Sequence, residues 1–162
     1  MIKNGRNEGL GVILVCLTTN SWLIVSHEFT NYFLIFNIMK EIVNKDECYL
    51  IIGKCMEVHN NLGAGLLEIV YKDALEYEFS NAGIDYEREK MYEVNYKGII
   101  LPHKFYADFV VYNNVILEVK GTNGISSESV AQAINYLKLS KNRLALIVNF
   151  GEISLKYKRV VI

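Results

Sequence analysis

The sequence predicts a single α/β domain in which a mixed sheet is flanked by helices. After residue 39, helical and extended segments follow one another in the order α-α-β-β-β-α-β-β, which is typical of this class. The chain has 162 residues, of which 51% are hydrophobic and 22% are charged. This length and this composition suit one compact domain and exclude a disordered chain.

Helical spacing of apolar residues predicts three helices, over residues 46–60, 65–81 and 127–140. Asp46 is a suitable N-cap for the first helix. Gly63 and Gly83 follow the first and second helices and are expected to end them, because glycine readily adopts the left-handed backbone of a helix C-terminus.

Five segments with the composition of strands predict the sheet, over residues 86–96, 99–111, 115–120, 143–150 and 153–161. Turns are expected at Lys97-Gly98, at Asn113-Asn114 and at Gly151-Glu152, where residues that favour turns separate the strands.

Residues 1–38 differ in character from the rest of the chain. They contain only four charged residues, which are Lys3, Arg6, Glu8 and Glu28. Residues 9–26 carry no charge, but the polar residues 18–21 interrupt a membrane span there. A signal peptide is a second alternative, although no small-x-small cleavage site follows. In the third alternative, translation begins at Met39 and the earlier residues are an upstream reading artefact or a loosely attached hydrophobic extension, ahead of a domain at residues 39–162. A membrane partner is expected only if residues 9–26 span the membrane.

Charge and cysteine content limit the possible partners and compartments. The net charge of −1 gives no general attraction to nucleic acid, so binding would need a local basic surface. The three cysteines form no CxxC pair, and Cys48 and Cys55 are spaced as core residues on one helix face. This pattern predicts reduced thiols and a cytoplasmic location.

The residues with the clearest chemical meaning are Asp108, Glu118 and Lys120. Side chains two apart on a strand share a face, so Glu118 and Lys120 point the same way. Asp108 lies on the preceding strand at about the same height. Two converging carboxylates repel each other unless a cation or a proton lies between them. Oxygen ligands without nearby His or Cys suit Mg²⁺ or Mn²⁺.

The length of the loop between these two strands decides whether the carboxylates meet. A two-residue turn at Asn113-Asn114 would pair Phe109 with Glu118 and send Asp108 to the opposite face. A three-residue loop over residues 112–114, or a bulge, would place Asp108 opposite Glu118. The metal hypothesis requires the second arrangement.

Ordinary solvated strand charges are the alternative interpretation of these residues. Against it, Asp108 and Glu118 lie in strongly apolar strands, where a charge is costly unless it is paired or bound to an ion.

Several motifs resemble one known family of proteins. Asp108, followed ten residues later by Glu118-Val119-Lys120, resembles the signature of the PD-(D/E)XK nuclease superfamily. Residues 65–71, GLLEIVY, match the pattern of its GxxExxY branch. Further matches are Cys55-Met-Glu-Val-His59, Gln132-Ala-Ile-Asn135-Tyr136-Leu137 and Val148-Asn149-Phe150-Gly151-Glu152.

This resemblance implies a restriction-endonuclease-like fold and a Mg²⁺-dependent phosphodiesterase site that acts on DNA or RNA. It implies that Asp108, Glu118 and the carbonyl of Val119 are metal ligands. Lys120 is implied to be the catalytic lysine, which positions water or stabilises negative charge.

The resemblance also assigns roles to residues outside the hairpin. Glu68 corresponds to a helix glutamate that completes the acidic cluster, and Gln132 to a polar residue beside the lysine. Each has a plain alternative: Glu68 as a solvated glutamate, and Gln132 as a buried amide next to Tyr136. Tyr71 either hydrogen-bonds or stacks near the site, or packs in the core. The chain departs from the family pattern at Ser129, where members often carry histidine.

Two functions remain open from the sequence: a metal-dependent nuclease, and a non-catalytic nucleic-acid- or protein-binding module on the same fold, because fold alone does not establish activity. The residues that could contact phosphates, or be ordinary solvated charges, are Lys138, Lys141, Arg143, Lys156, Lys158 and Arg159.

Overall fold

The computed structural model describes the backbone of residues 12–18, 21–26 and 30–162 and the side chains of residues 46–162. The chain divides into two compact units, Met1–Lys45 and Asp46–Ile162, which are treated separately below. The α/β sheet belongs to the second unit.

The first unit contains an antiparallel hairpin of β1 (Val12–Thr18) and β2 (Ser21–Ser26), which the sequence did not predict. Where it is described, the charge-free segment considered as a membrane span is therefore extended; residues 9–11 and 19–20 lie outside the described residues. The basic start of the alternative signal peptide, residues 3–6, also lies outside them. In the described part of the chain, no helix has both the length and the apolar character needed to cross a membrane.

The first helix begins earlier than the sequence predicted. α1 extends from Thr30 to Leu62 and so belongs to both units, whereas a start capped by Asp46 was expected. No glycine or proline lies between Thr30 and Asp46, so nothing in that segment breaks a helix. The division into an extension over residues 1–38 and a domain over residues 39–162 stays a prediction.

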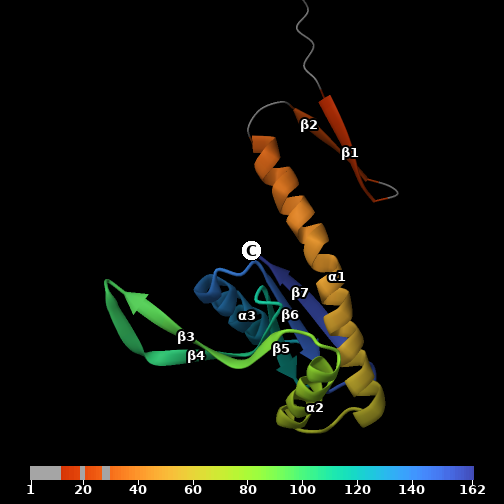
Figure 1. Ribbon diagram of the computed structural model, residues 1–162, viewed down its shortest axis with the longest axis vertical. Coiled ribbons are helices and arrows are strands. Elements are labelled where there is room, and N and C mark those ends of the chain that lie inside the picture. Colours follow the sequence, from red (N-terminus) through yellow and green to blue (C-terminus); the bar gives the residue numbers. More distant parts are fainter. Residues whose placement is uncertain (1–11, 19–20, 27–29) are drawn as a thin grey trace, which may run out of the picture. The chain divides into compact units, whose positions relative to one another are not determined.

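The second unit confirms the predicted α/β class and the order α-α-β-β-β-α-β-β (Figure 1). After α1 come α2 (Glu68–Asn81), β3 (Tyr86–Tyr96), β4 (Ile99–Val111), β5 (Val115–Lys120), α3 (Ser127–Ser140), β6 (Leu144–Asn149) and β7 (Lys156–Val161). The sheet order is β3-β4-β5-β6-β7. It is a mixed sheet because β5 and β6 are parallel and the other neighbours are antiparallel.

Two elements start three residues later than expected. α2 begins at Glu68 and not at residue 65, because Gly65 has a positive φ of 97° and stays outside the helix. β7 begins at Lys156 and not at residue 153. The late start of α2 places Glu68 in its first turn, beside the end of β5.

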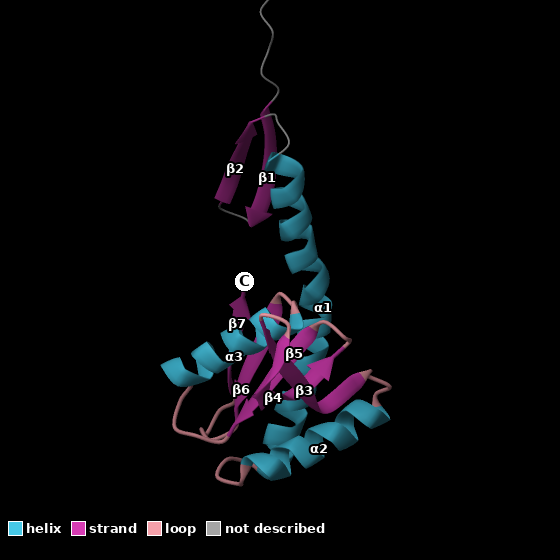
Figure 2. Ribbon diagram, turned by 90° about the vertical axis from the view of Figure 1, so that its left-hand side faces the viewer, coloured by secondary structure: helices cyan, strands magenta, loops and turns pink. Residues whose placement is uncertain are grey.

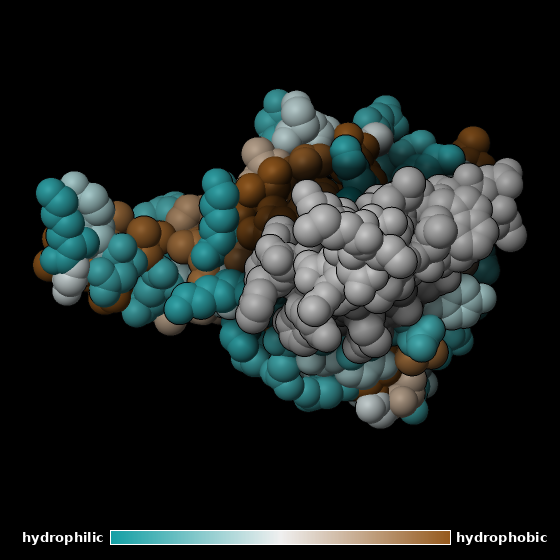
Figure 3. Space-filling model, turned by 90° about the horizontal axis from the view of Figure 1, so that it is seen from above, coloured by the Kyte–Doolittle hydropathy of each residue, from teal (hydrophilic) through white to brown (hydrophobic). Residues whose placement is uncertain are grey.

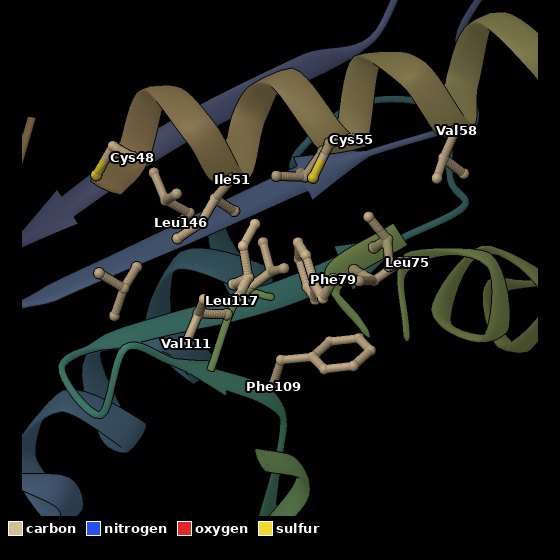
Figure 4. Close-up of a cluster of buried hydrophobic side chains, with 14 of the residues drawn as sticks. Cys48, Ile51, Cys55, Val58, Leu75, Phe79, Phe109, Val111, Leu117 and Leu146 are labelled. Atoms are coloured by element: carbon tan, nitrogen blue, oxygen red, sulfur yellow. The ribbon is translucent and has the colours of Figure 1, made fainter. Parts of the chain in front are cut away.

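Helices cover both faces of the sheet (Figure 2). On one face, α1 and α2 bury the larger core cluster, which includes Leu117 of β5. On the other face, α3 packs against a second cluster, which includes Ile116. Cys48 and Cys55 point from α1 into the larger cluster, as predicted (Figure 4). Since β5 is covered on both faces, a charged residue within it is enclosed by the domain.

The β3–β4 hairpin projects beyond the helices (Figure 1). Its outer half exposes apolar residues, among them Tyr96, Ile99 and Ile100. Polar and apolar residues are mixed over the surface of this projection, on the left of Figure 3.

Candidate active site at the ends of β4 and β5

The connection between β4 and β5 brings two carboxylates together. The loop consists of residues 112–114, and Val111 pairs with Val115 across it. The ladder ends at the pair Phe109 and Leu117, so Asp108 and Glu118 are the next residues on the two strands. The structure therefore has the three-residue loop that the metal hypothesis required.

Backbone amides of each strand bind the carboxylate of the other. The N–H of Asp108 donates to Oε1 of Glu118 at 3.3 Å. The N–H of Val119 donates to Oδ2 of Asp108 at 2.8 Å. These reciprocal hydrogen bonds hold the two acidic side chains beside each other at the same position of the sheet.

The carboxyl group of Glu118 lies in an unfavourable place for a negative charge. Its side chain is 1% exposed. Burial, followed by the charge of Asp108, raises the pKa of Glu118 to about 7, and the ammonium group of Lys120 partly offsets this rise. The site therefore favours either a proton or additional positive charge next to Glu118.

Two lysines supply positive charge. Nζ of Lys120 lies 3.4 Å from Oε2 of Glu118. Nζ of Lys72, from α2, lies 3.2 Å from Oδ1 of Asp108 and 3.3 Å from Oε1 of Glu89. Burial alone would lower the pKa of Lys72, but Asp108 and Glu89 hold it above its ordinary value. Lys72 was not predicted, although it follows Glu68 by four residues and so shares its side of α2.

The backbone of β3 is irregular directly beside Asp108. Arg88 pairs with Phe109 and Lys90 with Ala107, but Glu89 between them has a φ of 51°. A left-handed conformation is unusual for a residue other than glycine, and such residues concentrate at functional sites. The irregularity accompanies a change of face in β4, because Phe109 packs under α1 and α2 whereas Ala107 packs under α3.

Glu68 binds the chain immediately after Lys120. Its Oε1 accepts a hydrogen bond of 2.9 Å from the N–H of Gly121. Tyr71 supports the start of α2, because its hydroxyl donates to the carbonyl of Gly63 and its ring stacks on Phe150. Glu68 thus contacts the backbone of the site, and Tyr71 is a buried packing residue.

Gln132 contacts Tyr136, with which it was predicted to share a helix face. Nε2 of Gln132 donates to the Tyr136 hydroxyl at 3.1 Å, and this hydroxyl donates to the carbonyl of Tyr106 at 2.6 Å. Burial raises the pKa of Tyr136, and the charge of Glu118 raises it further. The pair therefore lies within electrostatic reach of the carboxylates.

Asn149 joins the two loops at the carboxyl ends of β5 and β6. It is fully buried, and it accepts hydrogen bonds from the N–H groups of Thr122 and Gly151. Its amide donates to the carbonyl of Thr122 at 2.8 Å. No role was predicted for it. The available signal was a polar residue that ends the apolar segment 144–148, in register with Lys120.

The donor set fits a hard divalent cation. Asp108 and Glu118 offer carboxylate oxygens, and a cation beside Glu118 would offset the burial and the charge of Asp108 that raise its pKa. Within residues 46–162, no three His, Cys, Asp or Glu side chains converge closely enough to hold one ion. A cation here would therefore use the two carboxylates with carbonyl, water or substrate oxygens, as Mg²⁺ commonly does.

Comparison with known proteins identifies the family. The sequence model of the PD-(D/E)XK nuclease superfamily matches residues 45–160, and the chain belongs to this superfamily. Nucleases of this superfamily typically use divalent metals. The match contains the Asp108–Glu118 pair and both lysines.

Comparisons with curated proteins and with solved structures do not refine this family assignment. No curated protein matches the sequence. The solved structure titled "Crystal structure of SSO0001" is similar over 57% of this chain and 48% of that chain, with 17% identity and a TM-score of 0.47. The chain thus covers about half of that protein.

Proposed function

We propose that this chain is a divalent-metal-dependent nuclease that hydrolyses phosphodiester bonds in DNA or RNA. The observation that supports it best is the pair of hydrogen-bonded carboxylates, Asp108 and Glu118, next to Lys120 in a member of a nuclease superfamily. The motif GLLEIVY at residues 65–71 supports assignment to the GxxExxY branch.

Asp108, Glu118 and the carbonyl of Val119 would hold Mg²⁺ or Mn²⁺. When bound, such an ion polarises a phosphoryl oxygen and lowers the pKa of a coordinated water. Lys120 stabilises the negative charge that develops as the phosphodiester is attacked, because its ammonium group already lies beside Glu118.

Two further residues position these groups. Glu68 holds the amide of Gly121 and so fixes the chain that follows Lys120. Gln132 orients the hydroxyl of Tyr136, which binds the backbone of β4 two residues before Asp108. We place both in the catalytic site as supports of the reacting groups.

Substitutions should separate metal binding from catalysis. Asp108→Ala and Glu118→Ala should weaken Mn²⁺ binding and abolish cleavage, because each removes a ligand. Lys120→Ala should retain or tighten Mn²⁺ binding, since it removes a positive charge, yet lower the cleavage rate on the order of a hundredfold or more. Lys97→Ala, at the tip of the β3–β4 hairpin, is the matched lysine control.

The assay would follow labelled single- and double-stranded DNA and RNA with Mg²⁺, with Mn²⁺ and with chelator. Cleavage that survives all three active-site substitutions would come from a contaminating nuclease. Metal binding by the wild type without cleavage of any substrate would contradict the nuclease and favour a binding module.

A further inference from the structure

Charge is distributed unevenly along the second unit. Residues 46–128 contain seven Lys or Arg and fourteen Asp or Glu, a net charge of −7. Residues 129–162 contain six Lys or Arg and one acidic residue, Glu152, a net charge of +5. The whole chain therefore has a net charge of only −1, although its C-terminal part, residues 129–162, is strongly basic.

Most Lys and Arg side chains of the acidic part, residues 46–128, already form ion pairs. Those with a carboxylate partner are Lys54, Lys72, Arg88, Lys90, Lys104 and Lys120. Four exposed lysines of the basic part have no such partner among residues 46–162: Lys138, Lys141, Lys156 and Lys158. We call these four residues the basic strip. Their positive charge is available to an external anion.

The strip begins at the rim of the candidate site. Lys156 pairs with Asn149 across β6 and β7, and Asn149 binds the loop that follows Lys120. Lys158 pairs with Ile147, one step further along β7. Because alternate residues of a strand share a face, both lysines lie on the face of Val160, which packs in the cluster under α3.

The other two lysines continue the strip at the far end of β7. Lys138 lies in the last turn of α3 and Lys141 is the C-cap of that helix, so both lie at its C-terminal end. The loop that follows α3 lies against the chain end, because the N–H of Ile162 donates to the carbonyl of Arg143 at 3.1 Å. α3 lies alongside β6 and β7 in Figures 1 and 2.

We infer that the basic strip binds the phosphate backbone of the nucleic acid next to the bond that is cleaved. This inference rests on the proposed function, because the strip leads away from a site assigned to phosphodiester chemistry. Lys156 and Lys158 are separated by about 7 Å at the usual rise of a strand, which is close to two nucleotide rises. Residues 46–128 carry a net charge of −7, which repels phosphates and so favours their contact with the basic strip.

The test measures binding without cleavage. Fluorescence anisotropy of the full chain with labelled 20-nucleotide single- and double-stranded DNA and RNA, in chelator and at 50 to 200 mM salt, gives affinity and its salt dependence. Lys156→Gln/Lys158→Gln should weaken binding about tenfold or more and reduce the slope of log K against log salt by about 2. Adding Lys138→Gln/Lys141→Gln should reduce the slope further.

The matched control is Lys90→Gln/Lys104→Gln, which removes two lysines that pair with Glu87 and Glu93. It should change the affinity less than twofold. A strip variant that binds as tightly as the wild type would overturn the inference, as would a control variant that loses as much affinity. Failure of the wild type to bind any of the four nucleic acids would also overturn it.

Failure of the inference can be distinguished from failure of the proposed nuclease. If the wild type cleaves nucleic acid while the strip variants bind normally, the proposed nuclease activity is supported and the binding role of the strip is rejected. If the wild type binds through the strip but cleaves no nucleic acid, the binding role of the strip is supported and the proposed nuclease activity is rejected.

Discussion

At the scale of single residues, the electrostatics of the site depend on Glu118. A carboxyl group with 1% exposure, beside a second carboxyl group, loses hydration and meets repulsion when it ionises. The domain retains this group despite the cost, and its neighbours supply two ammonium groups, Lys120 and Lys72. Under the proposed function, the domain retains this costly carboxyl group because it holds a divalent cation.

This cost predicts how stability depends on pH. The pKa of Glu118 is about 7 in the folded chain, against an ordinary value of 4.5. Between these values the folded state binds the proton more strongly, so its stability falls as pH rises from 4.5 to about 7 and stays low above. Glu118→Gln should therefore raise the melting temperature at pH 8 in chelator and have little effect near pH 4.5. A less stable variant at pH 8 would contradict this account.

The sequence predicted Asp108, Glu118 and Lys120 as candidate site residues, and the family resemblance added Glu68, Gln132 and the carbonyl of Val119. Lys72 and Asn149 were missed. Asp108, Glu118 and Lys120 could be predicted because strand alternation and one hairpin relate them. Lys72 contacts Asp108 across 36 residues, and Asn149 contacts Thr122 across 27. Contacts at such separations depend on how helices and strands pack, which local periodicity does not determine.

At the scale of elements, the β4–β5 loop shows why register could not be predicted from the sequence alone. Asn113-Asn114 favours a two-residue turn, yet the loop also includes Tyr112. Both Tyr112 and Asn113 have positive φ, 53° and 60°. Tyrosine seldom adopts this conformation, so sequence preference opposes the observed loop. Its ring packs against the larger core cluster, which offsets the backbone strain.

The loops after β5 and β6 are packed too closely to accept a side chain. A β-carbon at Gly151 would lie 2.3 Å from the carbonyl oxygen of Thr122. Gly151→Ala should therefore cost about 1–3 kcal/mol of stability and lower the cleavage rate by moving the chain that follows Lys120. Denaturant unfolding and the cleavage assay would measure the two effects.

Gly53→Ala is the matched control for this substitution. Gly53 lies within α1, and a β-carbon there meets nothing within 4 Å. Alanine favours a helix over glycine, so this variant should gain about 0.5–1 kcal/mol and cleave normally. Equal effects of the two substitutions would show that the approach of the two loops does not constrain the site.

At the scale of the whole molecule, we propose that the domain folds without the N-terminal residues. Among the described side chains, which begin at Asp46, those of Cys48, Ile51, Cys55 and Val58 pack from α1 into the larger core cluster (Figure 4). A chain that begins at Met39 should therefore unfold cooperatively, within a few degrees of the full chain, and retain nuclease activity. Calorimetry of the two proteins would test this, and loss of the cooperative transition would show that residues 1–38 belong to the domain.

The overall architecture was more predictable than its N-terminal part. From Asp46 onward, helical segments that end at glycines and apolar segments typical of strands predict the order of elements. The structure confirms this order. In the first unit the composition suggested a membrane span, a signal peptide or an extension, but not the β1–β2 hairpin. An apolar segment without regular periodicity does not distinguish a strand from a helix.

The most direct test of the central claim is calorimetric titration of Mn²⁺ and Mg²⁺ into the full chain at pH 8, above the pKa of Glu118. We predict binding by the wild type and by Lys120→Ala, and at least about tenfold weaker binding by Glu118→Ala, provided that each variant unfolds cooperatively. Equal binding by the wild type and Glu118→Ala, or cleavage of nucleic acid by the wild type in chelator, would contradict a metal-dependent nuclease centred on Asp108, Glu118 and Lys120.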